Sequence, residues 1–224
     1  MEASQIRVSP EAPRAAGTVR RSIVHLVAPA IAAMIGLGTH PAFADSVSPR
    51  GDAFTATSTS VTFIVDPVIV TCTRSSTSGR VPAAGVCGPI TAPTFSGCTT
   101  NLNTSGTVVA TGAWTLCVAN TGGHPTGTLT VPRRGVSASV TIFGSTCTAT
   151  AAPDRPENVT GRFLNGRSAM PTANPPSTVV FTGVSVPISP GGSAGCPMNT
   201  TATFTATYTV KDTTHSSAAI TVGP

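Results

Sequence analysis

The strongest pattern beyond residue 44 is an alternation of apolar and hydroxyl side chains with a period of two. From Ala202 to Val210, Ala, Phe, Tyr and Val occupy every second position, and threonines fill the positions between them. Successive side chains of a strand point to opposite faces, so this segment is predicted to be a strand with one apolar and one threonine face. Phe54–Val65 alternates in the same way.

Strand signals continue through the rest of this region, where Thr, Val and Ser dominate and Gly and Pro recur too often for a long helix. The predicted strands are Phe54–Val65, Val68–Arg74, Thr91–Cys98, Thr107–Ala119, Thr126–Val131, Val136–Phe143, Thr146–Ala151, Val159–Phe163, Val179–Ile188, Ala202–Val210 and Ala218–Val222. About eleven short strands with Gly, Pro, Asn and Asp between them predict an all-β fold, an antiparallel β-sandwich or a partly closed barrel.

Two polar segments are predicted to be long loops. Ser75–Gly88 is polar and Gly-rich, and 152–176 is Pro-rich and carries Arg155, Arg162 and Arg167. Long loops lie on the surface and either carry function or are tolerated insertions. If the three arginines formed one patch, an anionic envelope polymer would be a suitable partner.

The first 44 residues have the three parts of a secretory signal. A basic start contains Arg20-Arg21, the apolar run Ser22–Gly38 follows, and Ala42-Phe43-Ala44 has the small-x-small pattern of a cleavage site before Asp45. The prediction is a signal peptide at 1–44 and a single secreted domain at 45–224, exported by the general or the twin-arginine route. The run is too short for the ~20 apolar residues of a membrane helix, so no membrane span is expected after signal removal.

Charge excludes one class of partner. The chain carries a net charge of +5, but nine of the 13 Lys and Arg and six of the 8 Asp and Glu lie beyond residue 44. Arg133-Arg134 is the only adjacent basic pair there, and no basic stripe is visible, so a nucleic-acid partner is not expected. Lys211 is the only Lys, a bias typical of high-GC genomes that hints at an actinobacterial source.

Six cysteines in an exported chain predict three disulfides. They are Cys72, Cys87, Cys98, Cys117, Cys147 and Cys196. Six cysteines allow fifteen pairings, and spacing alone does not choose among them. A weak repeat, Thr-Cys-Thr followed later by Gly-Cys, occurs twice. If the halves are alike, the hypothesis is Cys72–Cys98 and Cys147–Cys196, which leaves Cys87 with Cys117.

A family resemblance follows from motifs in a fixed order. They are Phe54–Thr59, Val70–Thr73, Thr94–Cys98, Trp114–Leu116, Gly135–Ala138, Cys147–Thr150 and Ala202–Val210. Together they resemble a family of small secreted β-rich proteins of actinobacteria. The family pattern has two cysteine pairs, so the resemblance implies that Cys87 and Cys117 are additional here. It implies no activity.

The candidate catalytic motifs lack their structural context. Gly191–Gly195 matches G-x-S-x-G, but a nucleophile elbow needs a helix after the serine, and a β pattern follows here. His124 and His215 lie in predicted turns and are interpreted as exposed, since no nearby acidic or Cys partner completes a metal site. No catalytic, cofactor-binding or metal-binding residue is therefore assigned, and no cofactor is expected.

Other candidates have simpler interpretations. Asp154 and Glu157 are the only acids close in sequence, and they are interpreted as part of a solvated loop rather than a glycosidase pair. Arg50-Gly51-Asp52 matches the adhesion tripeptide, interpreted as a chance match near an exposed, flexible N-terminus. Trp114 and Tyr208 fall in strand patterns and are predicted to be core residues.

Three functions remain. The first is a non-enzymatic extracellular or cell-envelope protein that acts by surface contact with a cell-wall polymer or a surface protein. The alternative is a secreted module that binds a small apolar ligand between sheets. The third is a hydrolase that uses His124 or His215 with Ser193.

Overall fold

The computed structural model describes residues 45–167, 176–216 and 218–223. The predicted signal peptide, with Ala42 and Ala44 of its cleavage site, lies outside the described residues, and Asp45 is the first residue within them. No helix with the length and hydropathy to cross a bilayer occurs in the described ranges.

The described residues form fifteen strands, and the predicted all-β, disulfide-linked fold is confirmed. The strands are β1 (Ser46–Ser48), β2 (Ala53–Ser58), β3 (Val61–Val65), β4 (Val68–Arg80), β5 (Cys87–Ile90), β6 (Thr94–Thr100), β7 (Gly106–Ala110), β8 (Trp114–Thr121), β9 (His124–Val131), β10 (Val136–Ile142), β11 (Ser145–Ala151), β12 (Glu157–Leu164), β13 (Ser177–Gly192), β14 (Thr201–Asp212) and β15 (Thr221–Gly223).

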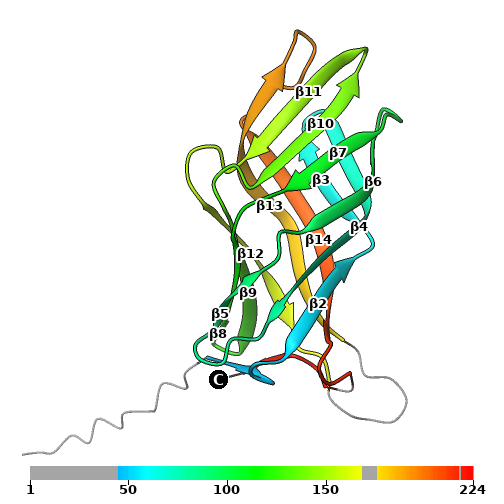
Figure 1. Cartoon of the computed structure of the whole chain (residues 1–224). Helices are drawn as coiled ribbons and strands as arrows, with labels where there is room; N and C mark the ends of the chain where they lie inside the picture. The colour runs from blue at the N-terminus through cyan, green and yellow to red at the C-terminus, as the bar shows by residue number, and fades with distance from the viewer. Residues whose placement is uncertain (1–44, 168–175, 217, 224) are drawn as a thin grey trace, which may run out of the picture. The chain divides into compact units, whose positions relative to one another are not determined.

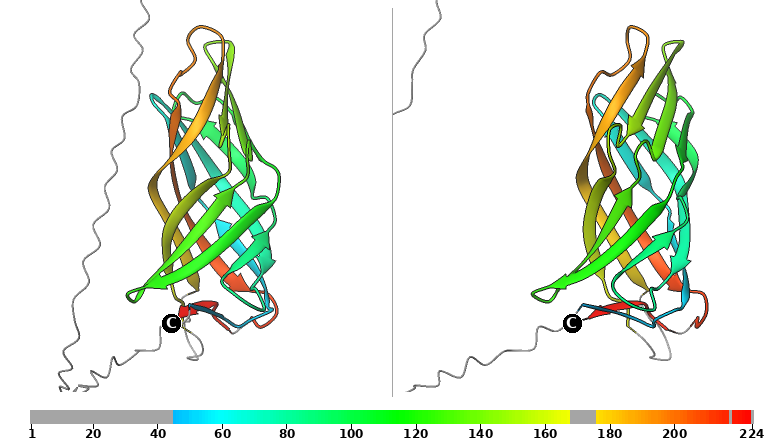
Figure 2. Two further views of the ribbon diagram at one scale, coloured as in Figure 1. Left: turned by 90° about the vertical axis from the view of Figure 1, so that its left-hand side faces the viewer. Right: turned by 60° about the vertical axis from the view of Figure 1, so that its left-hand side comes forward.

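Eight strands close into a barrel, and their order around the ring is their order along the chain (Figure 1). The ring runs β2, β4, β5, β8, β9, β12, β13 and β14, and β14 pairs with β2 to close it. Of the two arrangements that the sequence predicted, the structure therefore has the closed one, which leaves no edge strand in this ring. Figure 2 shows the barrel from two further sides, with strands on its near and far walls.

A second ring is stacked on the first. It runs β3, β4, β6, β7, β10, β11, β13 and β14, so β4, β13 and β14 belong to both rings. Its β6 and β7 are joined through the single bridge Thr99–Ser105. We call the ring that contains β2 the lower tier and the ring that contains β3 the upper tier. The base is the end at β1 and β15, and the rim is the end at the β10–β11 and β13–β14 tips (Figure 1).

One of the shared strands is irregular in its middle. In β13 the register with β14 shifts between Phe181 and Val184, and Gly183 adopts a φ of 61°. Such a bulge bends a strand and increases its twist, which lets a long strand follow the curvature of a barrel.

One predicted loop was wrong in its first part. Within Ser75–Gly88, β4 continues to Arg80 because its hydroxyl-rich second half pairs with β2 on one side and with β5 and β6 on the other. Long-range pairing, rather than local propensity, decides the structure of this polar segment.

The alternation in β14 is found as predicted. Phe204, Ala206 and Tyr208 are buried, and Thr205 and Thr207 are exposed. The buried rings continue a chain of aromatic contacts through the interior, in which Phe204 lies 5.4 Å from Phe63 and 5.4 Å from Phe181, centroid to centroid. Burial of each such ring contributes roughly 2–3 kcal/mol.

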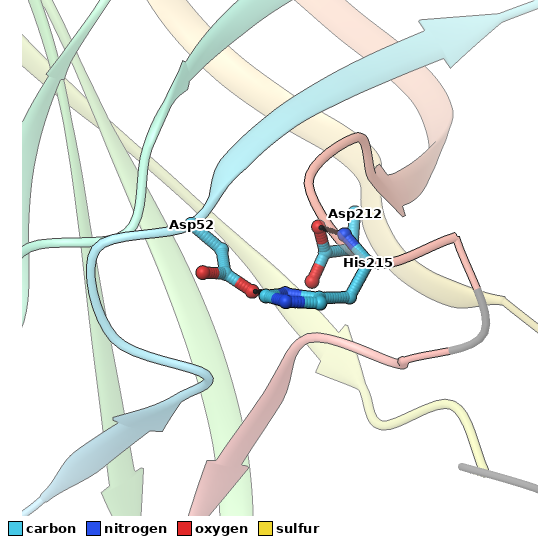
Figure 3. Close-up of side chains that lie close together, drawn as sticks. All are labelled: Asp52, Asp212 and His215. Atoms are coloured by element: carbon cyan, nitrogen blue, oxygen red, sulfur yellow. Dashed lines mark hydrogen bonds and ion pairs between the residues drawn. The ribbon is translucent and has the colours of Figure 1, made fainter.

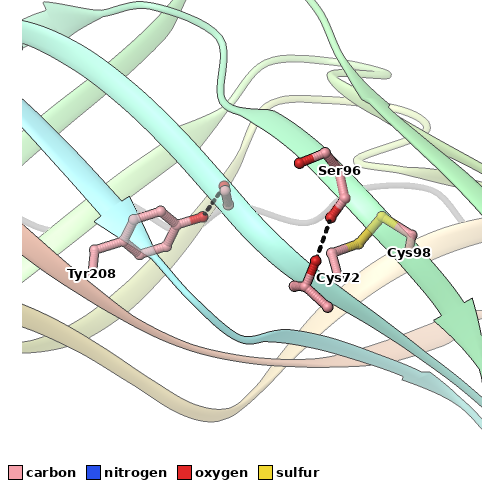
Figure 4. Close-up of a disulfide and its surroundings, with 6 residues drawn as sticks. Cys72, Ser96, Cys98 and Tyr208 are labelled. Carbon is pink, nitrogen blue, oxygen red and sulfur yellow. Dashed lines mark hydrogen bonds between the residues drawn. A yellow bond between two sulfur atoms is a disulfide. The ribbon is translucent and has the colours of Figure 1, made fainter.

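The three disulfides join Cys72 to Cys98, Cys87 to Cys117 and Cys147 to Cys196. These are the same pairs that the repeat suggested. The first two connect directly opposite residues of neighbouring strands, β4 with β6 (Figure 4) and β5 with β8. The third joins β11 to the connection between β13 and β14. Loop closure of these lengths stabilises the folded state by about 3.5–4 kcal/mol per bridge.

Candidate functional site

An apolar cavity of about 110 Å³ lies inside the barrel, mainly in the upper tier. Aromatic side chains from four different strands contribute to its wall, together with valines and alanines. The aromatic residues include Phe63, Phe95, Trp114 and Phe204. An eight-stranded barrel is just wide enough either to be filled by side chains or to hold one small ligand, and this barrel is incompletely filled.

Small inward side chains leave this volume open. Ala138, Ala149, Ala151 and Ala202 all line the cavity from β10, β11 and β14. Each occupies a position where a Leu or Phe would reach farther into the interior. This signal was available in the sequence, but it has meaning only once the facing strands are known.

Few polar groups line the cavity, and one of them already has a hydrogen-bond partner. Among the described residues that line the cavity, Tyr208 and Thr148 are the only ones with side-chain hydroxyl groups. The Tyr208 hydroxyl lies 2.8 Å from Ser75 Oγ, and both residues are buried (Figure 4). Burial raises the pKa of Tyr208 to about 12, against a smaller lowering by the hydrogen bond with Ser75. The wall is therefore uncharged at neutral pH, and it favours an uncharged ligand.

The lining of the cavity extends to the rim. Thr148, which lines it from β11, is exposed, and Pro190 and Pro197 of the β13–β14 hairpin line it nearby and are half-buried. The Cys147–Cys196 disulfide ties this hairpin to β11, and Cys147 itself lines the cavity. The bridge therefore holds the wall of the cavity in place at the rim.

A separate polar cluster lies at the base, where Asp52 precedes β2 and His215 follows β14 (Figure 3). His215 Nδ1 lies 2.7 Å from Asp52 Oδ2. Asp212, the last residue of β14, accepts hydrogen bonds from the backbone N–H groups of Thr214 and His215. The hydrogen bond from His215 lowers the pKa of Asp52, and the same bond with Asp52 raises the pKa of His215.

The interpretation of His215 as a turn histidine without an acidic partner is corrected here. Its turn folds back on the start of β2, which brings Asp52 from 163 positions away in the chain. Thr214 Oγ1 accepts a hydrogen bond from the Ala53 N–H, and the Thr213 N–H donates to the Ala53 carbonyl. Nothing local in the sequence indicates this contact.

Arg50 and Gly51 of the adhesion tripeptide are exposed as expected, but Asp52 is buried and the segment is held by hydrogen bonds. Asp52 is 8% exposed and is paired with His215. Arg50 donates to the carbonyls of Ala83 and Gly85, and the Gly51 N–H donates to Val81. A buried, paired aspartate is not available to a receptor.

Two of the proposed hydrolase residues, Ser193 and His215, are far apart. Ser193 follows β13 at the rim, whereas His215 follows β14 at the base. The 12 residues of β14 separate these ends, about 35 Å at ~3.3 Å per residue. A serine and a histidine at this separation cannot share a proton.

The arginines of the Pro-rich segment do not form one patch. Arg155 precedes β12 and pairs with Glu157 at 3.1 Å, and Arg162 lies near the other end of that strand. The part of β12 from Glu157 to Arg162 alone spans about 17 Å at ~3.3 Å per residue, and Arg155 lies beyond its start. Part of this segment, 168–175, lies outside the described residues.

Fold and site together define an eight-stranded, disulfide-linked barrel with an apolar internal cavity. A scan against protein-family models gives no match, and searches of curated proteins and of solved structures give none either.

Proposed function

We propose that this chain binds one small, uncharged, apolar molecule in the cavity of the upper tier. The observation that carries the proposal is the cavity itself, about 110 Å³ lined by a wall that is almost wholly carbon. Among the three functions considered from the sequence, this observation favours the ligand-binding module.

The size and chemistry of the cavity limit the ligand. Engineered apolar cavities of about 150 Å³ in another protein stay dry and bind benzene or xenon. This cavity is somewhat smaller and has Tyr208 and Thr148 as hydroxyl-bearing lining residues, so it suits a single-ring hydrocarbon with at most one polar group. A carboxylate would lose its hydration without gaining a cationic partner.

Export remains part of the proposal. Three disulfides in the described residues suit a chain that matures in an oxidising compartment. A small secreted carrier would hold a molecule that water dissolves poorly. The role in surface contact, with a wall polymer or a surface protein, stays a prediction.

Trp114 allows a direct test, because it is the only Trp in the chain and it lines the cavity. Toluene should change the Trp114 emission saturably and raise the melting temperature. Benzoate, which has a similar ring but carries a charge, should do neither.

The two neighbouring valines of β7 provide matched variants. Val108 is buried and lines the cavity, whereas Val109 is 46% exposed and does not. Val108→Phe should fill the cavity and abolish the response to toluene, and Val109→Phe should leave it unchanged. An equal response in both variants, or none in the unmodified chain, would overturn the proposal.

A further inference from the structure

We propose that Asp52, Asp212 and His215 form a site for a divalent transition-metal ion such as Zn²⁺ at the base of the barrel. One oxygen or nitrogen atom from each of the three residues lies within 4.8 Å of the other two. The site is independent of the apolar cavity, which lies mainly in the upper tier.

The backbone holds the two carboxylates in place before any ion binds. Asp212 is anchored through Oδ1, which accepts two backbone hydrogen bonds of 2.7 and 2.8 Å. Asp52 is followed by Ala53, whose N–H donates to Thr214 Oγ1 and whose carbonyl accepts from Thr213. Little conformational entropy is then lost on binding.

A separate observation points to a ligand. Asp212 is only 5% exposed, and its Oδ2 has no hydrogen-bond donor among the described residues. Figure 3 shows this second oxygen on the side of the carboxyl group that faces the His215 ring. A buried carboxylate oxygen without a donor is costly, and a cation between Asp52, Asp212 and His215 would satisfy it.

The ligand set selects the type of ion. Two carboxylates and one imidazole suit Zn²⁺ and related ions better than Ca²⁺ or Mg²⁺, which prefer oxygen alone. Zinc ligands lie about 2.0–2.2 Å from the ion, so two of them are about 3.4 Å apart in a tetrahedral site. The Asp52–His215 contact of 2.7 Å would open slightly to admit the ion. The His215 side chain is 64% exposed, so water can reach the remaining position.

Titration calorimetry of the chelator-treated full chain with Zn²⁺ tests the site. We expect one bound equivalent that Asp212→Asn and His215→Gln each weaken by about tenfold or more. Asp212→Asn keeps an oxygen for the two backbone N–H groups, and His215 is exposed, so both variants should fold. Circular dichroism melting checks this.

His124→Gln is the matched control, because His124, the first residue of β9, is also an exposed histidine but has no place in the cluster. It should bind Zn²⁺ as the unmodified chain does. Failure to bind Zn²⁺, or Zn²⁺ binding that Asp212→Asn and His215→Gln leave unchanged, would overturn the proposed site. Neither result would affect the toluene response of the cavity.

Discussion

At the scale of single residues, the pair Tyr208 and Ser75 is the most informative feature of the interior. Tyr208 lines the cavity, and its hydrogen bond with Ser75 leaves neither hydroxyl oxygen without a partner. A buried hydroxyl that lost its partner would cost about 1–3 kcal/mol. The Tyr208 hydroxyl can therefore lie beside an apolar ligand, because it is neutral and its hydrogen bond with Ser75 is already made.

The titration of Tyr208 can be read without interference, since it is the only Tyr in the chain. Its phenol should ionise with a midpoint near 12 rather than the ordinary 10.0, as followed by ultraviolet absorbance. The unfolded chain loses this proton first as pH rises. The stability that burial of the neutral phenol provides is therefore full below pH 10 and is lost between about pH 10 and 12, by about 2–3 kcal/mol. A midpoint near 10 in the folded chain would contradict the buried geometry.

At the scale of elements, the meeting of the two tiers depends on particular glycines. Gly161 of β12 lies against β13, where an added Cβ would come within 2.5 Å of the Val180 carbonyl oxygen and 2.8 Å of the Phe181 ring. Gly183 has free space around its Cα but adopts a φ of 61°. The first position requires Gly because of packing, and the second because of backbone conformation.

These two glycines give a comparative prediction for stability. Gly183→Ala should cost about 1–2 kcal/mol, the ordinary penalty of a left-handed conformation. Gly161→Ala should cost more, because a backbone oxygen and a buried ring must both move. Denaturant unfolding measures both variants. Equal losses, or a larger loss for Gly183→Ala, would show that β12 and β13 do not pack as described.

The disulfides differ in what they support. Replacement of Cys147 and Cys196 by serine should reduce stability by up to about 4 kcal/mol and should also weaken toluene binding, because this bridge fixes the rim. Replacement of Cys87 and Cys117 should cost a similar amount but leave toluene binding intact, since neither residue lines the cavity. Calorimetry in parallel with the Trp114 titration separates the two effects. Toluene affinity that is equal in both variants would contradict the assigned role of the rim bridge.

The sequence predicts elements well where one face is buried and the other is not. β14 is the clearest case, because Phe204 and Tyr208 alternate with exposed threonines along its length. The second half of β4 was missed, since Ser, Thr and Gly there have no apolar alternation and are held by pairing with β2. The three disulfide pairs could be suggested because the repeat places similar motifs around two of them.

At the scale of the whole molecule, the contacts that create both sites are the long-range ones. The pairing of β14 with β2 closes the barrel, and the same approach brings His215 to Asp52. Neither the closed ring nor the cavity follows from local periodicity, which permits an open sandwich equally well. The sequence analysis looked for the partners of His215 among its neighbours in the chain, so it missed the cluster with Asp52 at the base.

The central claim is that the upper tier holds a small uncharged molecule, and native mass spectrometry of the full chain purified from its source tests it most directly. The account predicts a subpopulation heavier by the mass of one small neutral molecule, which denaturation releases and Val108→Phe eliminates. A chain that carries no such mass, and that also takes up no toluene when exposed to it, would contradict the account.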